Sequence, residues 1–257
     1  MLPMTVVDLH HSFEGPADAG VVVLSNSLGT TLELWEPQAA PLARDHRVLR
    51  YDMRGHGRSP VPETPYSMAD LGADLIGLLD RNGIERASLC GVSLGGMVSM
   101  WVAAHAPERV DRLVLCSTSA IMGPPESWTE RAALVRREGV GAVADSTVAR
   151  WFTPAFAAAE PEVVAGIRAQ LAATPAEGYA GCCEAIREMD QRPDLAAVAA
   201  PTLVIAAEGD PSTPPAHART IAELIPGARL EVLDRGAHLV NVEAPDLVTP
   251  LVAAHLA

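Results

Sequence analysis

Short apolar runs alternate along the chain with longer stretches of helical pattern. The short runs are mostly continuous in Val, Leu and Ile, which predicts strands covered on both faces; they span 20–26, 46–52, 87–93, 111–117, 201–207 and 228–234. Helices are predicted over 33–43, 68–82, 94–106, 214–225 and 244–256. This alternation predicts an α/β fold with a mostly parallel central sheet and helices on both of its faces.

The alternation stops between about residues 123 and 194, where the chain is helix-forming, rich in Ala and Glu, and without a strand pattern. The segment opens with "GPPESW" and closes with "QRPDL". Ligands bind beyond the carboxyl ends of the strands in open α/β sheets, so we expect a helical insertion over that edge. The sequence thus predicts a core in two parts, 1–122 and 195–257, with a helical cap or lid at 123–194.

The segment "GVSLGG", which begins at Gly91, places Ser93 between a predicted strand and a predicted helix. This is the context of the G-x-S-x-G turn, which raises a serine hydroxyl above the sheet. A turn this sharp needs small neighbours because strand and helix approach closely. The pattern predicts Ser93 as a nucleophile; the alternative is a serine that only caps the helix.

A serine nucleophile needs a base and a group that orients the base, and in this kind of turn the acid and then the histidine follow the serine along the chain. Of the eight histidines, His238 lies in the loop directly after the last predicted strand, and we expect it to be the base, whereas His255 lies near a helix end. Asp210 follows the strand at 201–207, where its carboxylate can accept the imidazole N–H. Glu208 and Asp234 are the alternatives, with Asp234 expected to end the last strand in a turn.

A tetrahedral intermediate needs backbone N–H groups around its oxyanion. One donor is expected from Leu94, the residue after the serine, and the other from the loop after an earlier strand. The loop "LSNSLGTT" supplies Leu28 as the predicted second donor, with Gly29 as the nearby alternative.

The net charge of the 257-residue chain is −13 at pH 7, which disfavours nucleic acid as a partner and leaves attraction of an anionic substrate to local charges. No apolar run approaches the ~20 residues that span a bilayer, and the N-terminus has no secretory pattern, so we expect a cytoplasmic protein away from membranes. The cysteines are expected to be free thiols; they are Cys90, Cys116, Cys182 and Cys183.

Four stretches of the chain resemble the α/β-hydrolase superfamily, and within it the 3-oxoadipate enol-lactonases of bacterial aromatic catabolism. They are "SNSLGTTLELW", "RYDMRGHGRS", "GVSLGGMVSMWVAAHAPERVDRLVLCST" and "AHLVNVEAPD". Asn26 and Ser27 stand where many α/β-hydrolases have His-Gly, and "NSLG" at this place is typical of the enol-lactonases. "RGHGRS" is widespread in the superfamily, and its His56 is interpreted as a structural loop residue.

The resemblance implies hydrolysis of the enol lactone of 3-oxoadipate through an acyl-enzyme on Ser93, with His238 as base and no metal or organic cofactor. The partner would be a small lactone or ester that carries a carboxylate, so a nearby cation is expected. The insertion offers several candidates without deciding between them: Arg131, Arg136, Arg137, Arg168, Arg187, Trp128, Trp151 and Tyr179. Whether Arg235, close to His238, faces the pocket is left open.

Other functions fit the same catalytic residues. The alternatives are a carboxylesterase, a perhydrolase or a C–C hydrolase, because substrate choice depends on the lid and pocket rather than on the fold. A more remote alternative is a sensor that binds a small molecule without converting it.

Overall fold

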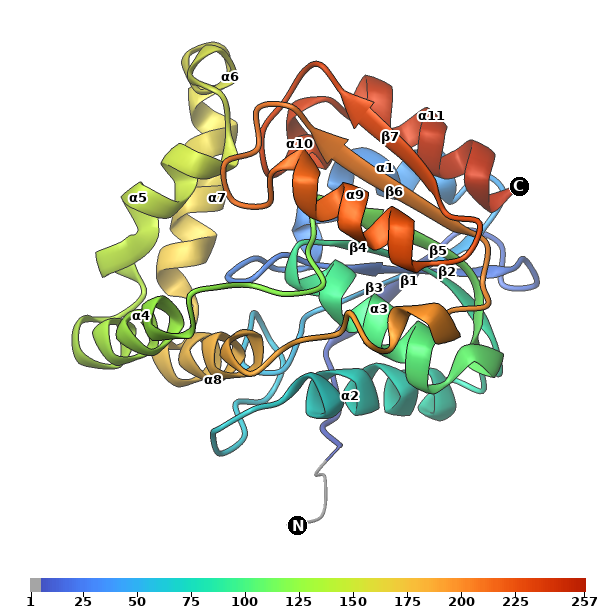
Figure 1. The fold of residues 1–257 in the computed structure, drawn as a ribbon, viewed down its shortest axis with the longest axis horizontal. Coiled ribbons are helices and arrows are strands. Elements are labelled where there is room, and N and C mark those ends of the chain that lie inside the picture. The colour runs from blue at the N-terminus through green and yellow to red at the C-terminus, as the bar shows by residue number, and fades with distance from the viewer. Residues whose placement is uncertain (1–5) are drawn as a thin grey trace.

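A seven-stranded sheet forms the centre of the molecule in the computed structural model, which describes residues 6–257 (Figure 1). The strand order is β1-β3-β2-β4-β5-β6-β7, and every neighbouring pair is parallel except β1 with β3. The strands are β1 (His11–Glu14), β2 (Val21–Ser25), β3 (Arg47–Tyr51), β4 (Ala87–Val92), β5 (Val110–Cys116), β6 (Thr202–Ala207) and β7 (Arg229–Leu233). The six predicted strands are present, and the central ones are buried on both faces.

The edge strand β1 was not predicted from the sequence. Its four residues, "HSFE", are all partly buried and contain a single large apolar side chain, Phe13. A strand this short and polar acquires its conformation from antiparallel pairing with β3 and not from an apolar pattern of its own.

Five helices were predicted outside the long insertion; the short helix at 240–243 was not, and the bounds of two predicted helices are corrected, so residues 6–257 contain six α-helices there. They are α1 (Glu36–Leu42), α2 (Met68–Arg81), α3 (Leu94–His105), α9 (Pro215–Leu224), α10 (Val240–Glu243) and α11 (Pro245–Leu256); the short 3₁₀ helices are η1 (Leu32–Trp35), η2 (Pro107–Arg109) and η3 (Leu195–Ala197). The helix predicted over 33–43 is divided into η1 and α1. The one predicted over 244–256 begins at Pro245, because the residue before a proline is disfavoured in helical conformation, and Ala244 is not helical.

The segment between β5 and β6 folds into five helices beside one end of the sheet, at the left of Figure 1. These are α4 (Pro125–Glu138), α5 (Gly141–Trp151), α6 (Pro154–Ala159), α7 (Pro161–Ala173) and α8 (Ala176–Arg187). A single antiparallel bridge between Ile121 and Asp190 joins the two ends of the segment. We propose that residues 123–194 act as a cap over the site described below.

One close contact fixes the helix α8 on the core. The backbone of Gly178 lies against that of Gly55, so that a Cβ built on Gly178 would lie 2.1 Å from the Gly55 carbonyl oxygen. No side chain fits between two backbones at this distance. Within residues 6–257, none of the helices combines the length and the apolar character that crossing a bilayer requires.

Replacement of Gly178 by alanine should therefore destabilise the protein. We expect Gly178→Ala to lower the free energy of unfolding by about 1–3 kcal/mol, because the new methyl group overpacks the contact. Gly166→Ala on α7 is the matched control: its added Cβ meets nothing within 4 Å, and removing a helical glycine should raise the free energy of unfolding by about 0.4–1 kcal/mol. Chemical denaturation of both variants measures the difference, and equal stability of the two would contradict the contact.

Candidate active site

Ser93 sits on a sharp turn between β4 and α3, with φ 55° and ψ −119°. Its N–H donates to the Cys116 carbonyl at 3.0 Å, and its carbonyl accepts the Thr118 hydroxyl at 2.6 Å. The glycines of the motif are required by space, since a Cβ on Gly95 would lie 2.1 Å from the carbonyl oxygen of Ser25 on β2. The turn thus fixes the backbone of Ser93 at the carboxyl end of the central strand β4.

The three side chains predicted from the sequence lie in one hydrogen-bonded chain. His238 Nε2 is 2.9 Å from Ser93 Oγ, and His238 Nδ1 is 2.9 Å from Asp210 Oδ2. The Asp210 carboxylate can only accept at this distance, so Nδ1 carries the proton and Nε2 is free to accept the serine O–H. All three residues are buried, whereas the alternatives Glu208 and Asp234 are exposed.

Asp210 is held as an anion by its surroundings. Its carboxylate accepts the N–H groups of Ser212 and Thr213 at 2.8 and 3.0 Å and the Thr213 hydroxyl at 2.7 Å. Burial favours the neutral acid, but the His238 charge and the hydrogen bonds from His238 and Thr213 outweigh it and lower the pKa of Asp210 to about 2. Sequence analysis missed Thr213; the "DPST" pattern, typical of an aspartate that accepts N–H groups two and three residues ahead, is the signal that could have found it.

Two backbone N–H groups near Ser93 are available for a ligand. Within residues 6–257, neither Leu28 N–H nor Leu94 N–H donates to a protein acceptor. The Leu94 N–H belongs to the first turn of α3, where amides have no partner inside the helix. The alternative donor Gly29 is already engaged, because its N–H donates to His56 Nε2 at 2.9 Å.

A cavity of about 380 Å³ opens beside Ser93 and His238. Leu28, Thr213 and Met97 line it from the core. The helices of residues 123–194 line the opposite side with aromatic and basic side chains: Trp128, Arg131, Arg150, Trp151 and Tyr179. Among residues 6–257, no group of three or more His, Cys, Asp and Glu side chains is placed to hold a metal ion.

Residues 20–245 match the family model described as the alpha/beta hydrolase fold. The chain belongs to the α/β-hydrolase family. It is 42% identical over 248 residues to 3-oxoadipate enol-lactonase 2 of Acinetobacter baylyi, which covers 96% of this chain and 92% of that protein. The fold class and the resemblance to enol-lactonases are confirmed by this comparison.

Two solved structures of α/β hydrolases are similar to this one along nearly the whole chain. The enol-lactonase from Burkholderia xenovorans LB400 has a TM-score of 0.95 at 43% identity, with 97% of this chain and 96% of that chain covered. A thermophilic esterase from Thermogutta terrifontis with bound malate has a TM-score of 0.92 at 30% identity, with 97% and 93% covered. The α/β-hydrolase identified here is therefore similar in structure to enzymes named for lactone and for ester substrates.

Two of the arginines in this hydrolase, Arg131 and Arg150, face the cavity without a carboxylate partner among residues 6–257. Arg131 donates from Nε to the Tyr179 hydroxyl at 2.8 Å and from its terminal nitrogen to the Thr147 hydroxyl. Burial and the positive charge of Arg131 lower the pKa of Arg150. Two uncompensated guanidinium groups in one cavity favour an anionic ligand.

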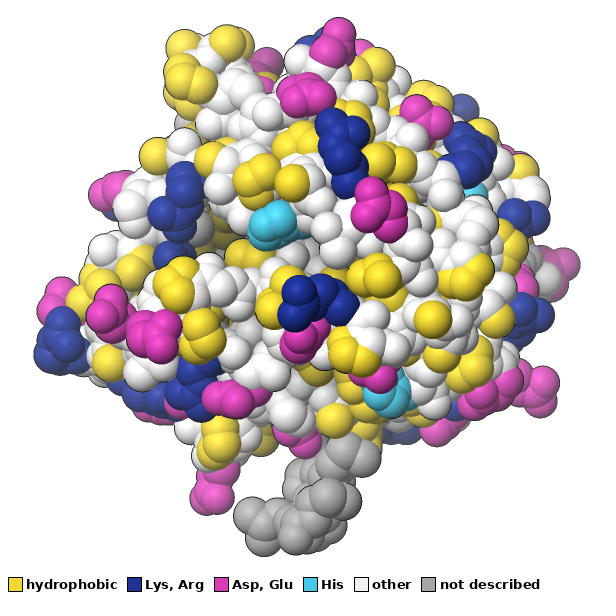
Figure 2. Space-filling model, viewed as in Figure 1, with side chains coloured by type: hydrophobic (Ala, Val, Ile, Leu, Met, Phe, Trp, Pro, Cys, Tyr) yellow, Lys and Arg dark blue, Asp and Glu magenta, His cyan; other side chains and the backbone are white. Residues whose placement is uncertain are grey.

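The remaining arginines that the sequence left open form ion pairs instead. Arg136 pairs with Glu177 and Glu184, and the other pairs are Arg137 with Glu138, Arg168 with Asp145, Arg187 with Glu188 and Arg235 with Asp246. Basic and acidic groups are accordingly interspersed over the face seen in Figure 2. None of these five arginines lines the cavity.

The low pKa of Asp210 should appear as a pH dependence of stability. Because the folded-state pKa of about 2 lies below the ordinary 3.8, the ionised carboxylate stabilises the fold above about pH 4, and this contribution is lost as the pH falls through about 2. Between about pH 5 and pH 2, we expect the wild-type free energy of unfolding to fall by about 2 kcal/mol more than that of Asp210→Asn. The exposed Asp234→Asn variant is the control and should follow the wild type; a wild-type profile like that of Asp210→Asn would contradict the assignment.

Proposed function

We propose that the protein is a serine hydrolase that opens the enol lactone of 3-oxoadipate to 3-oxoadipate. The observation that carries the proposal is the hydrogen-bonded chain of Ser93, His238 and Asp210 at the wall of a cavity lined also by two arginines that have no carboxylate partner among residues 6–257. The enol-lactonase names of the A. baylyi and B. xenovorans relatives support the substrate. The activity would then belong to bacterial catabolism of aromatic compounds.

The first half of the reaction forms an acyl-enzyme. Ser93 Oγ bonds to the lactone carbonyl carbon as His238 Nε2 takes the hydroxyl proton, and the carbonyl oxygen becomes an oxyanion that accepts the N–H groups of Leu28 and Leu94. Collapse of this intermediate breaks the bond to the ring oxygen, and His238 returns the proton to that oxygen. The released enol becomes a ketone, which makes it a better leaving group than a simple alkoxide.

The second half releases the product. Because the ester is cyclic, the ketone stays attached to the acyl group, and water must reach the acyl carbon beside it. His238 takes a proton from this water, the new tetrahedral intermediate collapses, and Ser93 recovers its proton. Asp210 serves throughout by holding His238 in the tautomer with its proton on Nδ1 and by stabilising the imidazolium form.

Arg131 and Arg150 are proposed to bind the carboxylate of the substrate. The net charge of −13 repels an anion at long range, but that repulsion is screened beyond about 10 Å at ordinary ionic strength. Two guanidinium groups within the cavity act at contact distance, where a charge-assisted hydrogen bond to a carboxylate contributes about 1.5–3 kcal/mol. Local attraction therefore exceeds the long-range repulsion.

A cytoplasmic location completes the proposal. All four cysteines are buried and free, as expected in a reducing compartment. A small lactone or ester and the water that hydrolyses the acyl-enzyme are the molecules that this mechanism needs.

Ser93→Ala tests the nucleophile. We expect it to reduce kcat for the enol lactone by about 10⁴-fold or more while the fold is kept, because the three catalytic residues act as a unit. Loss of the ultraviolet absorbance of the lactone measures turnover, and circular dichroism checks the fold. Ser212→Ala is the control, since Ser212 lines the same cavity but its side chain is outside the hydrogen-bonded chain. Unchanged turnover in Ser93→Ala would contradict the assignment of Ser93 as the nucleophile, whereas a wild type that binds the lactone without turnover would favour the sensor alternative.

A comparison of substrates separates the lactonase from the alternative hydrolases. We expect Arg131→Met and Arg150→Met each to raise KM for the enol lactone about 10- to 100-fold, the loss of one charge-assisted contact, with little change for the uncharged ester p-nitrophenyl acetate. Arg168→Met, whose arginine pairs with Asp145 on α5, is the control. An equal rise in KM for the enol lactone and for p-nitrophenyl acetate would contradict carboxylate binding. A wild type that cleaves only the aryl ester would favour the carboxylesterase alternative.

A further inference from the structure

The peptide group between Ser27 and Leu28 is fixed by its carbonyl end. The Ser27 carbonyl accepts the Thr30 N–H at 3.2 Å and the Thr30 hydroxyl at 2.8 Å. In a trans peptide the C=O and N–H point in opposite directions. Anchoring the Ser27 carbonyl on Thr30 therefore aims the Leu28 N–H away from this turn.

The next peptide group is held by His56. Gly29 adopts φ +79°, which a glycine tolerates at the third position of such a turn, and its N–H donates to His56 Nε2 at 2.9 Å. On the other side of the ring, His56 Nδ1 donates to the Arg54 carbonyl at 3.1 Å. A carbonyl can only accept and an N–H can only donate, so this geometry requires the neutral ring with its proton on Nδ1.

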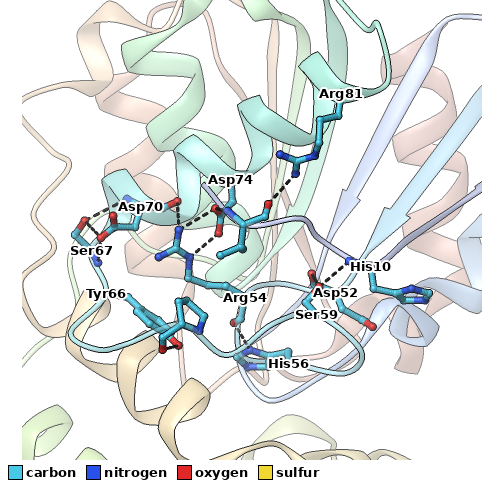
Figure 3. A network of polar contacts seen from close by, with 12 residues as sticks. His10, Asp52, Arg54, His56, Ser59, Tyr66, Ser67, Asp70, Asp74 and Arg81 are labelled. Carbon is cyan, nitrogen blue, oxygen red and sulfur yellow. Dashed lines mark hydrogen bonds and ion pairs between the residues drawn. The ribbon is translucent and has the colours of Figure 1, made fainter. Parts of the chain in front are cut away.

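His56 lies in the loop after β3, which polar contacts join to α2 (Figure 3). Arg54 pairs with the buried Asp74, with one bond of 2.8 Å, and stacks its guanidinium over the Tyr66 ring. Asp52, in the same loop, accepts the Leu32 N–H at 2.9 Å. The turn that contains Leu28 is thus attached to this loop through buried groups.

Leu28 can contact a substrate directly, whereas His56 can act on the reaction only by fixing other groups. Leu28 lines the cavity, whereas His56 is 1% exposed and is not among the lining residues in the described part of the chain. Burial lowers the pKa of His56, against the opposing effects of the Arg54 carbonyl and the Asp52 carboxylate, and so favours the neutral acceptor. The hydrogen bond from the Gly29 N–H is the contact that links the ring to the turn beside the cavity.

We propose that His56 is a positioning residue for ester hydrolysis: by accepting the Gly29 N–H, its neutral ring fixes the turn that presents the Leu28 N–H to the oxyanion. This inference rests on the proposed function, in which Leu28 supplies one of the two oxyanion donors. The "RGHGRS" loop then has a part in the reaction as well as in the fold. The effect concerns the oxyanion, so it is greater in the transition state than in the bound substrate.

The test compares two substitutions at His56 with one at a second buried histidine. His56→Leu removes the acceptor, whereas His56→Gln can place its amide oxygen where Nε2 lies. His255→Leu is the matched control, because His255 is also buried and bonded to a backbone carbonyl, that of Pro201 at 3.0 Å. We expect His56→Leu to lower kcat for the enol lactone about 10- to 100-fold, while KM changes less than about threefold. This loss in kcat is smaller than the 10²- to 10³-fold loss that follows removal of a whole oxyanion donor, because the Leu28 N–H is displaced and not deleted. His56→Gln should recover most of kcat.

Hydrogen exchange provides a readout that does not need turnover. We expect the amides of residues 26–32 to exchange faster in His56→Leu than in the wild type, and at the wild-type rate in His56→Gln and His255→Leu. If the wild type hydrolyses neither the enol lactone nor p-nitrophenyl acetate, the proposed function fails. The amide exchange of residues 26–32 then still tests whether His56 holds the turn. If kcat or the exchange of 26–32 is unchanged in His56→Leu, or if KM rises as much as kcat falls, the positioning role is overturned while the serine mechanism stands.

Discussion

The backbone of Ser93 is the constraint on which the rest of the site depends. A non-glycine residue with φ 55° and ψ −119° costs of order 1–3 kcal/mol and persists only where its surroundings enforce it. The enforcement comes from glycines at the points of closest approach and from hydrogen bonds to Cys116 at the end of β5 and to Thr118, two residues later. Because the strained turn stands at the carboxyl end of a central strand, the loops after β2, β6 and β7 can all reach it.

Charge is distributed so that the surface and the cavity have opposite character. The protein is strongly acidic, and most arginines on the helices of residues 123–194 are paired with carboxylates of the same region. Arg131 and Arg150 differ because no carboxylate among residues 6–257 forms an ion pair with either; Arg131 donates to the hydroxyl groups of Tyr179 and Thr147, and Arg150 lines the same cavity. Their positive charge is therefore left for a ligand, which is the physical basis for the carboxylated substrate in the proposed function.

Helices of residues 123–194, the proposed cap, contact the core at the turn that carries Leu28. A Cβ on Gly29 would lie 2.3 Å from the Leu171 side chain on α7, and the Tyr179 ring on α8 is the next nearest group. Tyr179 also accepts a hydrogen bond from Arg131. The same aromatic side chain therefore lies against the proposed oxyanion turn and bonds to an arginine of the proposed carboxylate site.

The sequence alone determined the elements whose signals are local. Continuous apolar runs identified the parallel strands, and the glycines around Ser93 identified its turn because their spacing is a local steric requirement. The positions of Asp210 and His238 just after strands indicated that they could meet, since the carboxyl ends of parallel strands share one edge. The roles of these residues stay predictions, whereas their proximity is a feature of the structure.

Tertiary structure decided what depends on residues far apart in the chain. The edge strand β1 is too short and polar to form without β3 beside it. Which arginines face the cavity follows from the packing of α4, α5 and α8, because helical spacing alone allowed each of them to be either paired or free. The choice of Leu28 over Gly29 as the free donor likewise rests on His56, 27 residues away. A local pattern specifies local conformation, but the partner of a hydrogen bond or an ion pair is specified only when the chain has folded.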